Sequence, residues 1–203
     1  MKCKNSLVLR AICLFTTGAF LSLVLNMLQI QHHLPSFKHK LVLKLLYSSW
    51  WVPTICGIGS AIVGLLYPCF DSKLGEQLLE SPEWSKVMRC ITLFVGINHA
   101  TTKINFSSNL ELSISLAVLS IGLWWVFDRT RSGFGMGIGI AILATLMIQM
   151  LVQHEFCKFT EREFLYIRSW LPSIVFSGGV TIGNIGRKLA LIEEENGSKK
   201  HQE

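Results

Sequence analysis

Charged residues are scarce in this chain, and their scarcity excludes most soluble architectures. Only 16% of the 203 residues are charged, whereas half are hydrophobic and the mean hydropathy is +0.44. Soluble domains usually carry about 25% charged residues. Intrinsic disorder is excluded as well, because disordered chains combine low hydrophobicity with high net charge. The composition therefore predicts an integral membrane protein without a sizeable soluble domain.

Motifs for catalysis and metal binding are also missing. The six cysteines are scattered, with no CxxC pair and no histidines at zinc spacing. The serines of the apolar runs lack a Gly-x-Ser-x-Gly elbow, and His99 has no histidine or carboxylate four residues further on. Ionisable residues lie at the ends of the apolar runs and not near their middles, where a pump would need them. We therefore expect no enzyme, no metal and no cofactor, while a small passive transporter or channel stays open.

The net charge of +6 is the remaining compositional signal. On a soluble protein it would suggest nucleic acid as a partner. No basic stretch is interleaved with aromatic residues, so we expect no nucleic acid. Lysines and arginines that flank membrane spans meet anionic membrane lipid, and this is the interpretation we favour.

Long uncharged runs are what the chain has in place of soluble motifs. A helix that crosses the bilayer needs about 20 residues, so the length has room for six spans and short loops. The expected spans are 8–30, 47–69, 85–103, 110–127, 132–153 and 166–186, followed by a polar tail over 187–203. The third and fourth are short, and one of them could instead be a re-entrant segment. The prediction is a single all-α membrane domain, a six-helix bundle over residues 1–203.

The distribution of basic residues predicts the orientation of this bundle. Twelve of the 19 lysines and arginines fall on the side of the N-terminus. Because basic residues collect on the cytoplasmic side, both termini should be cytosolic. The glycosylation sequon at Asn196 would then stay unmodified.

Small residues recur at four-residue spacing within the apolar runs. This spacing lets membrane helices approach closely, or leaves a concave seat for a flat lipid. The examples are Ser60 with Gly64, Gly179 with Gly183, and Gly133 with Gly137 and Ala141.

The densest group of aromatic and charged residues is the short connection between the fourth and fifth spans, residues 124–133. It combines an aromatic belt with Asp128 and two arginines. One interpretation is an interface anchor in which Asp128 neutralises a neighbouring arginine. The other is a docking edge for a second membrane protein, with Asp128 at the surface of the bundle. The residues alone favour neither.

Several segments of the chain are distinctive: LWWVFDRTRSGFG at 123–135, YSSWWVP at 47–53, GLLYPC at 64–69, VMRC at 87–90, FVGINHA at 94–100, FLYIRSWLP at 164–172 and GNIGR at 183–187. In these segments the chain resembles the Insig (insulin-induced gene) family of endoplasmic-reticulum sterol regulators. The similarity extends from about residue 7 to 191.

The resemblance implies a function that the residues alone do not. It implies a multi-pass protein of the endoplasmic reticulum membrane that regulates cholesterol metabolism and is not an enzyme. Such proteins bind an oxysterol, such as 25-hydroxycholesterol, and retain the escort protein Scap with its transcription-factor cargo SREBP. They also bind HMG-CoA reductase and bring membrane-bound ubiquitin ligases to it. A sterol-independent membrane assembly factor is the alternative within the same architecture.

Particular residues inherit roles from the resemblance. Phe94 and Trp124 match sterol-pocket positions, and Asp128 matches the aspartate that partner binding requires. A third pocket position, a glutamine in the family, is Glu111 here, and an ionised carboxylate beside a sterol costs desolvation unless it is paired. Thr130 replaces a family serine and keeps a hydroxyl that a kinase could phosphorylate.

Overall fold

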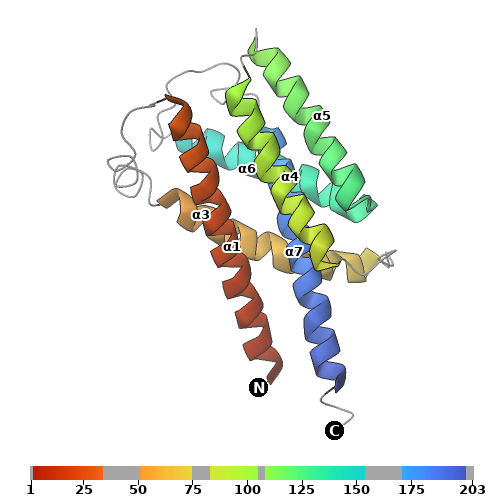
Figure 1. Ribbon diagram of the computed structural model, residues 1–203. Helices are drawn as coiled ribbons and strands as arrows, with labels where there is room; N and C mark the ends of the chain where they lie inside the picture. Colours follow the sequence, from red (N-terminus) through yellow and green to blue (C-terminus); the bar gives the residue numbers. More distant parts are fainter. Residues whose placement is uncertain (1, 34–50, 75–82, 105–107, 154–170, 200–203) are drawn as a thin grey trace.

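The computed structural model describes residues 2–33, 51–74, 83–104, 108–153 and 171–199. All regular structure within these ranges is α-helical (Figure 1). The helices are α1 (Lys2–His33), α3 (Trp51–Leu74), α4 (Trp84–Lys103), α5 (Asn109–Phe127), α6 (Arg131–Gln153) and α7 (Leu171–Lys199). The predicted fold class, an all-α bundle of six helices, is confirmed for this part of the chain.

α4, α5 and α6 match their expected spans to within one residue, whereas α1 begins six residues earlier, at Lys2, and α3 ends five residues later, at Leu74. α4 and α5, the two short spans, are each a single uninterrupted helix of 20 and 19 residues. At 1.5 Å per residue each is about 30 Å long, which matches the hydrocarbon core of a bilayer. α7 continues to Lys199, so most of the segment expected to be a polar tail is helical.

Four of the described helices are long and apolar enough to cross a membrane by themselves. Their apolar segments are Ser6–Leu28, Val52–Leu74, Leu110–Phe127 and Arg131–Met150. α7 differs because it lies in the middle of the bundle, in contact with each of the other five described helices (Figure 1). Residues 176–186 of α7 are almost all buried, so this helix faces protein and not lipid. Its polar side chains therefore need protein partners, and they find them.

Small residues place α3 directly against α7. Pro68 lies inside α3 and has no N–H, so the carbonyl of Gly64 lacks its usual partner four residues on. Gly186 of α7 covers this carbonyl, and a Cβ there would overlap the carbonyl oxygen and lie 2.8 Å from the Gly64 Cα. Only glycine allows this backbone-to-backbone approach.

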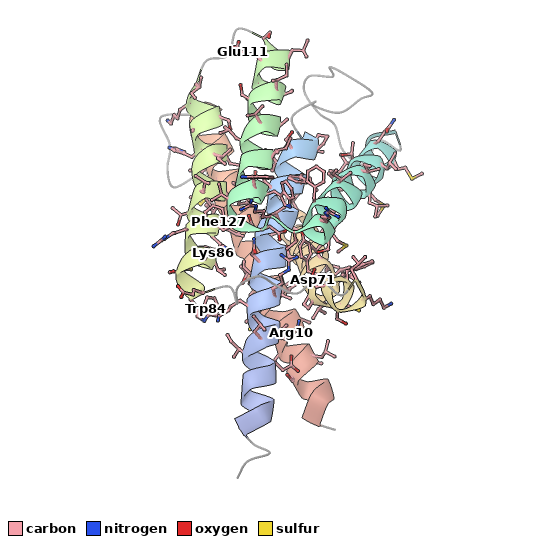
Figure 2. The ribbon with its side chains drawn as sticks, turned by 90° about the vertical axis from the view of Figure 1, so that its right-hand side faces the viewer. Arg10, Asp71, Trp84, Lys86, Glu111 and Phe127 are labelled. Atoms are coloured by element: carbon pink, nitrogen blue, oxygen red, sulfur yellow. The ribbon has the colours of Figure 1, made fainter. Side chains whose placement is uncertain are left out.

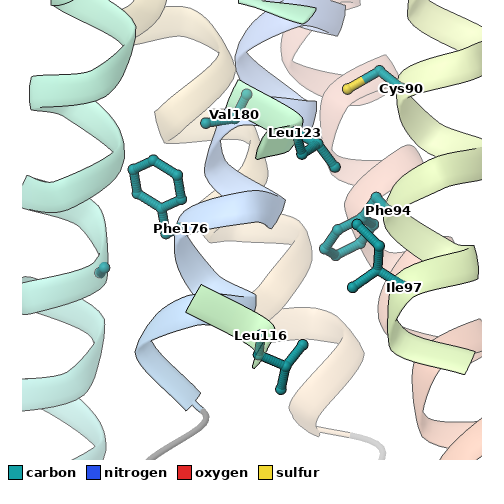
Figure 3. Close-up of a cluster of buried hydrophobic side chains, with 8 residues drawn as sticks. Cys90, Phe94, Ile97, Leu116, Leu123, Phe176 and Val180 are labelled. Atoms are coloured by element: carbon teal, nitrogen blue, oxygen red, sulfur yellow. The ribbon is translucent and has the colours of Figure 1, made fainter. Parts of the chain in front are cut away.

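The apolar core lies between α4, α5 and α7 (Figure 3). α4 contributes Cys90, Phe94 and Ile97, α5 contributes Leu116 and Leu123, α7 contributes Phe176 and Val180, and α6 adds Ala141. We call this set the apolar cluster. It joins α4 and α5, which carry the predicted ligand residues, to α7.

Candidate functional site

Arg187 of α7 is the centre of a buried polar site. Its side chain is only 1% exposed, although the sequence places it among the flanking charges. The guanidinium donates to both carboxylate oxygens of Asp71 on α3, from Nε at 2.6 Å and from Nη2 at 3.0 Å. Nη1 donates to Oδ1 of Asp128, where α5 ends. One arginine therefore joins three parts of the chain that are far apart in sequence.

Hydroxyl groups complete this site. The Thr130 Oγ1 accepts from Arg187 Nη2 at 2.9 Å and from the Gly133 amide at 3.0 Å, and it donates to Asp128 Oδ1 at 2.7 Å. A hydroxyl has one proton and two lone pairs, so Thr130 uses its full hydrogen-bonding capacity. Ser132 Oγ donates to Asp71 Oδ1 at 2.7 Å. We call Asp71, Asp128, Thr130, Ser132 and Arg187 the polar clasp.

Tyr67 forms one wall of the polar clasp. The Arg187 guanidinium lies over its ring, 4.9 Å from the centroid, and its hydroxyl donates to the carbonyl of Gly133 at 3.1 Å. The other side of the ring is pressed against Gly183, where a Cβ would overlap it. The predicted small-residue position at Gly183 thus makes room for an aromatic ring.

The turn between α5 and α6 has a defined local geometry. The amides of Asp128 and Arg129 both donate to the carbonyl of Trp124, at 2.9 and 2.8 Å. Arg129 has φ of 57°, the left-handed conformation that commonly ends a helix and that glycine favours. Thr130 then caps α6, because its side chain accepts from the amide three residues on. This tight reversal turns Asp128 inward and Arg129 outward.

The position of Asp128 corrects both sequence-based interpretations of it. Its side chain has no exposed area, so it does not lie at the surface of the bundle. Its ionic partner is the distant Arg187 and not a neighbouring arginine. Its second oxygen, Oδ2, is buried, has no hydrogen-bond partner within the described residues and lies against Gly133.

The predicted ligand residues fall into two groups. Phe94 belongs to the apolar cluster and is 4% exposed. Trp124 packs beside the same cluster, with its ring centroid 4.6 Å from that of Phe134, and its Nε1 donates to the carbonyl of Thr130 at 3.1 Å. Trp124 therefore connects the apolar cluster to the turn of the polar clasp.

Glu111 lies elsewhere. It is exposed in the first turn of α5, where its amide donates to the capping Ser108, at the end of the helix opposite Phe127 (Figure 2). Thirteen residues separate it from Trp124, about 20 Å along a helix. A ligand that touches both would have to lie along α5.

A groove of about 500 Å³ lies between α5, α6 and α7. Its lining is mostly apolar and includes Ser120, Phe134, Ala141, Ser173 and Phe176. Phe134 of the lining contacts Trp124, and Phe176 belongs both to the groove lining and to the apolar cluster. Neither Phe94 nor Glu111 lines it.

Sequence reasoning missed Asp71 and Arg187 as site residues. The count of basic residues treats Arg187 as a flanking charge, because single charges at the ends of apolar runs usually are flanking residues, and it gives Asp71 no role. The sequence did contain a usable signal. The second and sixth predicted spans end on the same side of the membrane as Asp128, and the residues at those ends, Asp71 and Arg187, have opposite charges. Within the described residues, no three acidic, histidine or cysteine side chains gather as metal ligands.

Comparison with known proteins identifies the family. The sequence model of the insulin-induced protein (INSIG) family matches residues 9–190. This chain belongs to the INSIG family. It is 56% identical to the insulin-induced gene 2 protein of Gallus gallus over 93% of this chain and 84% of that protein. It is equally identical to the insulin-induced gene 1 protein of Xenopus laevis, over 94% of this chain and 76% of that protein.

A solved structure of an INSIG homolog has the same fold. The crystal structure of MvINS from Mycobacterium vanbaalenii superposes with a TM-score of 0.69, covering 89% of this chain and 94% of that one, at 17% identity. The resemblance to the INSIG family and the multi-pass membrane architecture are thereby confirmed.

Proposed function

We propose that this INSIG-family protein is an oxysterol-binding regulator of cholesterol synthesis in the endoplasmic reticulum membrane. The observation that carries the proposal is the family match over residues 9–190, nearly the whole length of the helical bundle. In this role the protein retains the Scap–SREBP complex and promotes sterol-dependent degradation of HMG-CoA reductase through membrane-bound ubiquitin ligases. It is a binding protein and not an enzyme, with both termini cytosolic.

Conditional association is the proposed mechanism. A sterol seated beside Phe94 and Trp124 buries apolar surface on this protein and on its partner. A ligand shifts an equilibrium only by its differential affinity for the two states, so the sterol must bind the complex more tightly than the free proteins. The contact of Trp124 with the α5–α6 turn supports this link, because it joins the proposed sterol side to Asp128.

Capture of Scap tests the function most directly. Purified protein should retain Scap in detergent when 25-hydroxycholesterol is present and release it when the sterol is absent. Sterol-independent capture would favour an assembly factor. Flux through liposomes in the absence of any partner would favour a passive transporter or channel.

The sterol site has its own test. Phe94→Leu and Trp124→Phe reshape the proposed pocket while keeping apolar bulk, and both should weaken competition for labelled 25-hydroxycholesterol. Leu21→Met, in a separate buried cluster that includes Leu14 and Val87, is the matched control. Wild-type competition by both pocket variants would remove the assigned site.

Glu111→Gln tests whether the exchange of the family glutamine matters. Glu111 is exposed, and a glutamine there has no charge to desolvate against a sterol. We expect the variant to bind 25-hydroxycholesterol more tightly than wild type. Equal affinity would place Glu111 outside the sterol site.

Phosphorylation of Thr130 is a further part of the proposal. Its hydroxyl is fully engaged in the polar clasp, so a kinase could reach it only after the turn opens. A phosphate there would place negative charge beside Asp128 and remove the hydroxyl donor. Thr130→Glu should therefore weaken Scap capture, whereas Thr130→Ser should not.

A further inference from the structure

The burial of Asp128 is difficult to reconcile with a direct role in partner binding. Its side chain has no exposed area. Oδ1 accepts from Arg187 and Thr130, and Oδ2 lies against the backbone of Gly133. A partner could not reach either oxygen without opening the turn.

Arg129 of the turn and Trp125 at the end of α5 are among the side chains that this region does expose. The Arg129 guanidinium lies over the Trp125 ring, 4.9 Å from its centroid, and Trp125 is 57% exposed. Arg129 holds a left-handed backbone conformation that costs an L-residue free energy relative to glycine. Such a conformation persists only where the surrounding structure fixes it.

The polar clasp supplies that fixation from inside the bundle. Asp71 orients the guanidinium of Arg187 with two hydrogen bonds, and the remaining donors of Arg187 reach Asp128 and Thr130 of the turn. Ser132 ties Asp71 to the start of α6 as well. The shape of the turn therefore depends on residues of α3 and α7 that lie outside it.

We propose that Asp71 and Arg187 are positioning residues for partner binding, and that Asp128 acts through them and not by touching the partner. The buried clasp holds the α5–α6 turn in the shape that presents Arg129 and Trp125. This inference rests on the proposed function, because it concerns how the same turn recognises its membrane partner.

Asp71→Asn is the decisive variant. The Asp71 side chain is 8% exposed and belongs to α3, so a direct-contact role for Asp128 predicts wild-type capture of Scap. The clasp predicts at least about tenfold weaker capture, because a hydrogen bond to a charged group is lost inside the protein. Binding of 25-hydroxycholesterol should be retained. Capture at wild-type strength by Asp71→Asn would overturn the proposal.

A stability-matched control separates positioning from general destabilisation. Leu21→Ala removes buried volume on α1, away from the turn, and lowers stability through a cavity. At equal melting temperature, Leu21→Ala should capture Scap as wild type does while Asp71→Asn does not. Equal loss in both variants would overturn the proposal, because the effect would follow stability alone.

Trypsin provides a readout that needs no partner. Arg129 and Arg131 are both exposed in or beside the turn. Asp71→Asn should speed cleavage after these residues, detected by mass spectrometry, more than at Lys73 or Lys86. An unchanged cleavage rate would overturn the proposal even if Scap were not the partner. Failure of wild-type protein to capture Scap would count against the proposed function and not against the clasp.

An apolar replacement of all three charges gives the complementary result. Arg187→Met with Asp71→Leu and Asp128→Leu leaves no unpaired charge, and such exchanges are often neutral or stabilising. If this triple variant folds with a wild-type cleavage pattern at the turn, Scap capture should return although Asp128 is gone. A wild-type pattern without capture would mean that the carboxylate contacts the partner directly.

Discussion

The polar clasp and the apolar cluster are neighbours in one bundle, yet they hold it together in different ways. In the clasp, one guanidinium, two carboxylates and two hydroxyls meet through short directional bonds between α3, the α5–α6 turn and α7. In the cluster, mostly apolar side chains of α4, α5 and α7 pack against one another, and Cys90 adds polar contacts, long ones with Thr181 and Asn184. Trp124 touches both regions.

The polar clasp and the apolar cluster differ in how they respond to substitution. A buried charge that loses its partner is strongly destabilising, whereas an apolar contact that loses a methyl group is only weakened. The clasp therefore specifies one arrangement of three chain segments, and the cluster tolerates repacking. The cluster is therefore suited to a ligand or partner whose binding requires side chains to repack. The clasp is suited to a switch between two discrete conformations.

Breaking the clasp at its centre should have the largest effect. Arg187→Met leaves Asp71 and Asp128 buried without their counter-charge, and we expect a loss of about 3–5 kcal/mol in stability. Thermal unfolding in detergent measures this loss. A melting temperature close to wild type would show that the two carboxylates find other partners.

Truncation in the cluster should cost somewhat less and depend on shape. Leu123 is 1% exposed on α5, so Leu123→Ala should lose about 2–4 kcal/mol through the cavity it leaves. Leu123→Met nearly conserves volume and should lose less than about 1.5 kcal/mol. If both variants lose equally, the cluster is as specific as the clasp, and the contrast between the two regions fails.

Two glycines sharpen the comparison at smaller scale. Gly133 lies against the Asp128 carboxylate, and a Cβ there would overlap it, so Gly133→Ala should disturb the clasp and lower the melting temperature. Gly122 of α5 has open space around it, and Gly122→Ala should raise stability by about 0.5–1 kcal/mol through helix propensity. Opposite signs for the two variants are the expected result. The same sign for both would contradict the assigned packing.

The smallest effect concerns an ion pair outside both regions. Hydrogen bonding from Ser6, together with the hydrogen bond and charge of Arg10, lowers the pKa of Glu193, with the Arg10 Nη1 at 3.1 Å. A carboxylate whose pKa is lower in the folded protein than in the unfolded one stabilises the fold at pH values above its unfolded-state pKa. This stabilisation is lost as the pH falls through the folded-state pKa. Glu193→Gln should thus cost less than about 1 kcal/mol at neutral pH. The difference from wild type should disappear in acid; a difference that persists at low pH would point to packing.

Much of the fold follows from the sequence, because uncharged runs bounded by charged residues indicate where five of the described helices lie. The end of α7 does not follow. A single arginine after an apolar run looks like a membrane flank, and only Asp71 and Asp128, 116 and 59 residues away along the chain, make its burial favourable. The clasp is a long-range property that no local pattern contains. Phe94 and Trp124 were predicted from family resemblance, and their packing beside one cluster was not readable from spacing.

The contact between Gly64 and Gly186 has a consequence for how the protein is made. α7 is not among the described helices with enough hydropathy to enter a bilayer alone, and it is synthesised after the helices it touches. In the nascent protein, before α7 is added, the carbonyl of Gly64 and the carboxylates of Asp71 and Asp128 therefore form a template that lacks its α7 partners. Insertion of α7 completes that template, because Arg187 then pairs with both carboxylates and Gly186 covers the carbonyl.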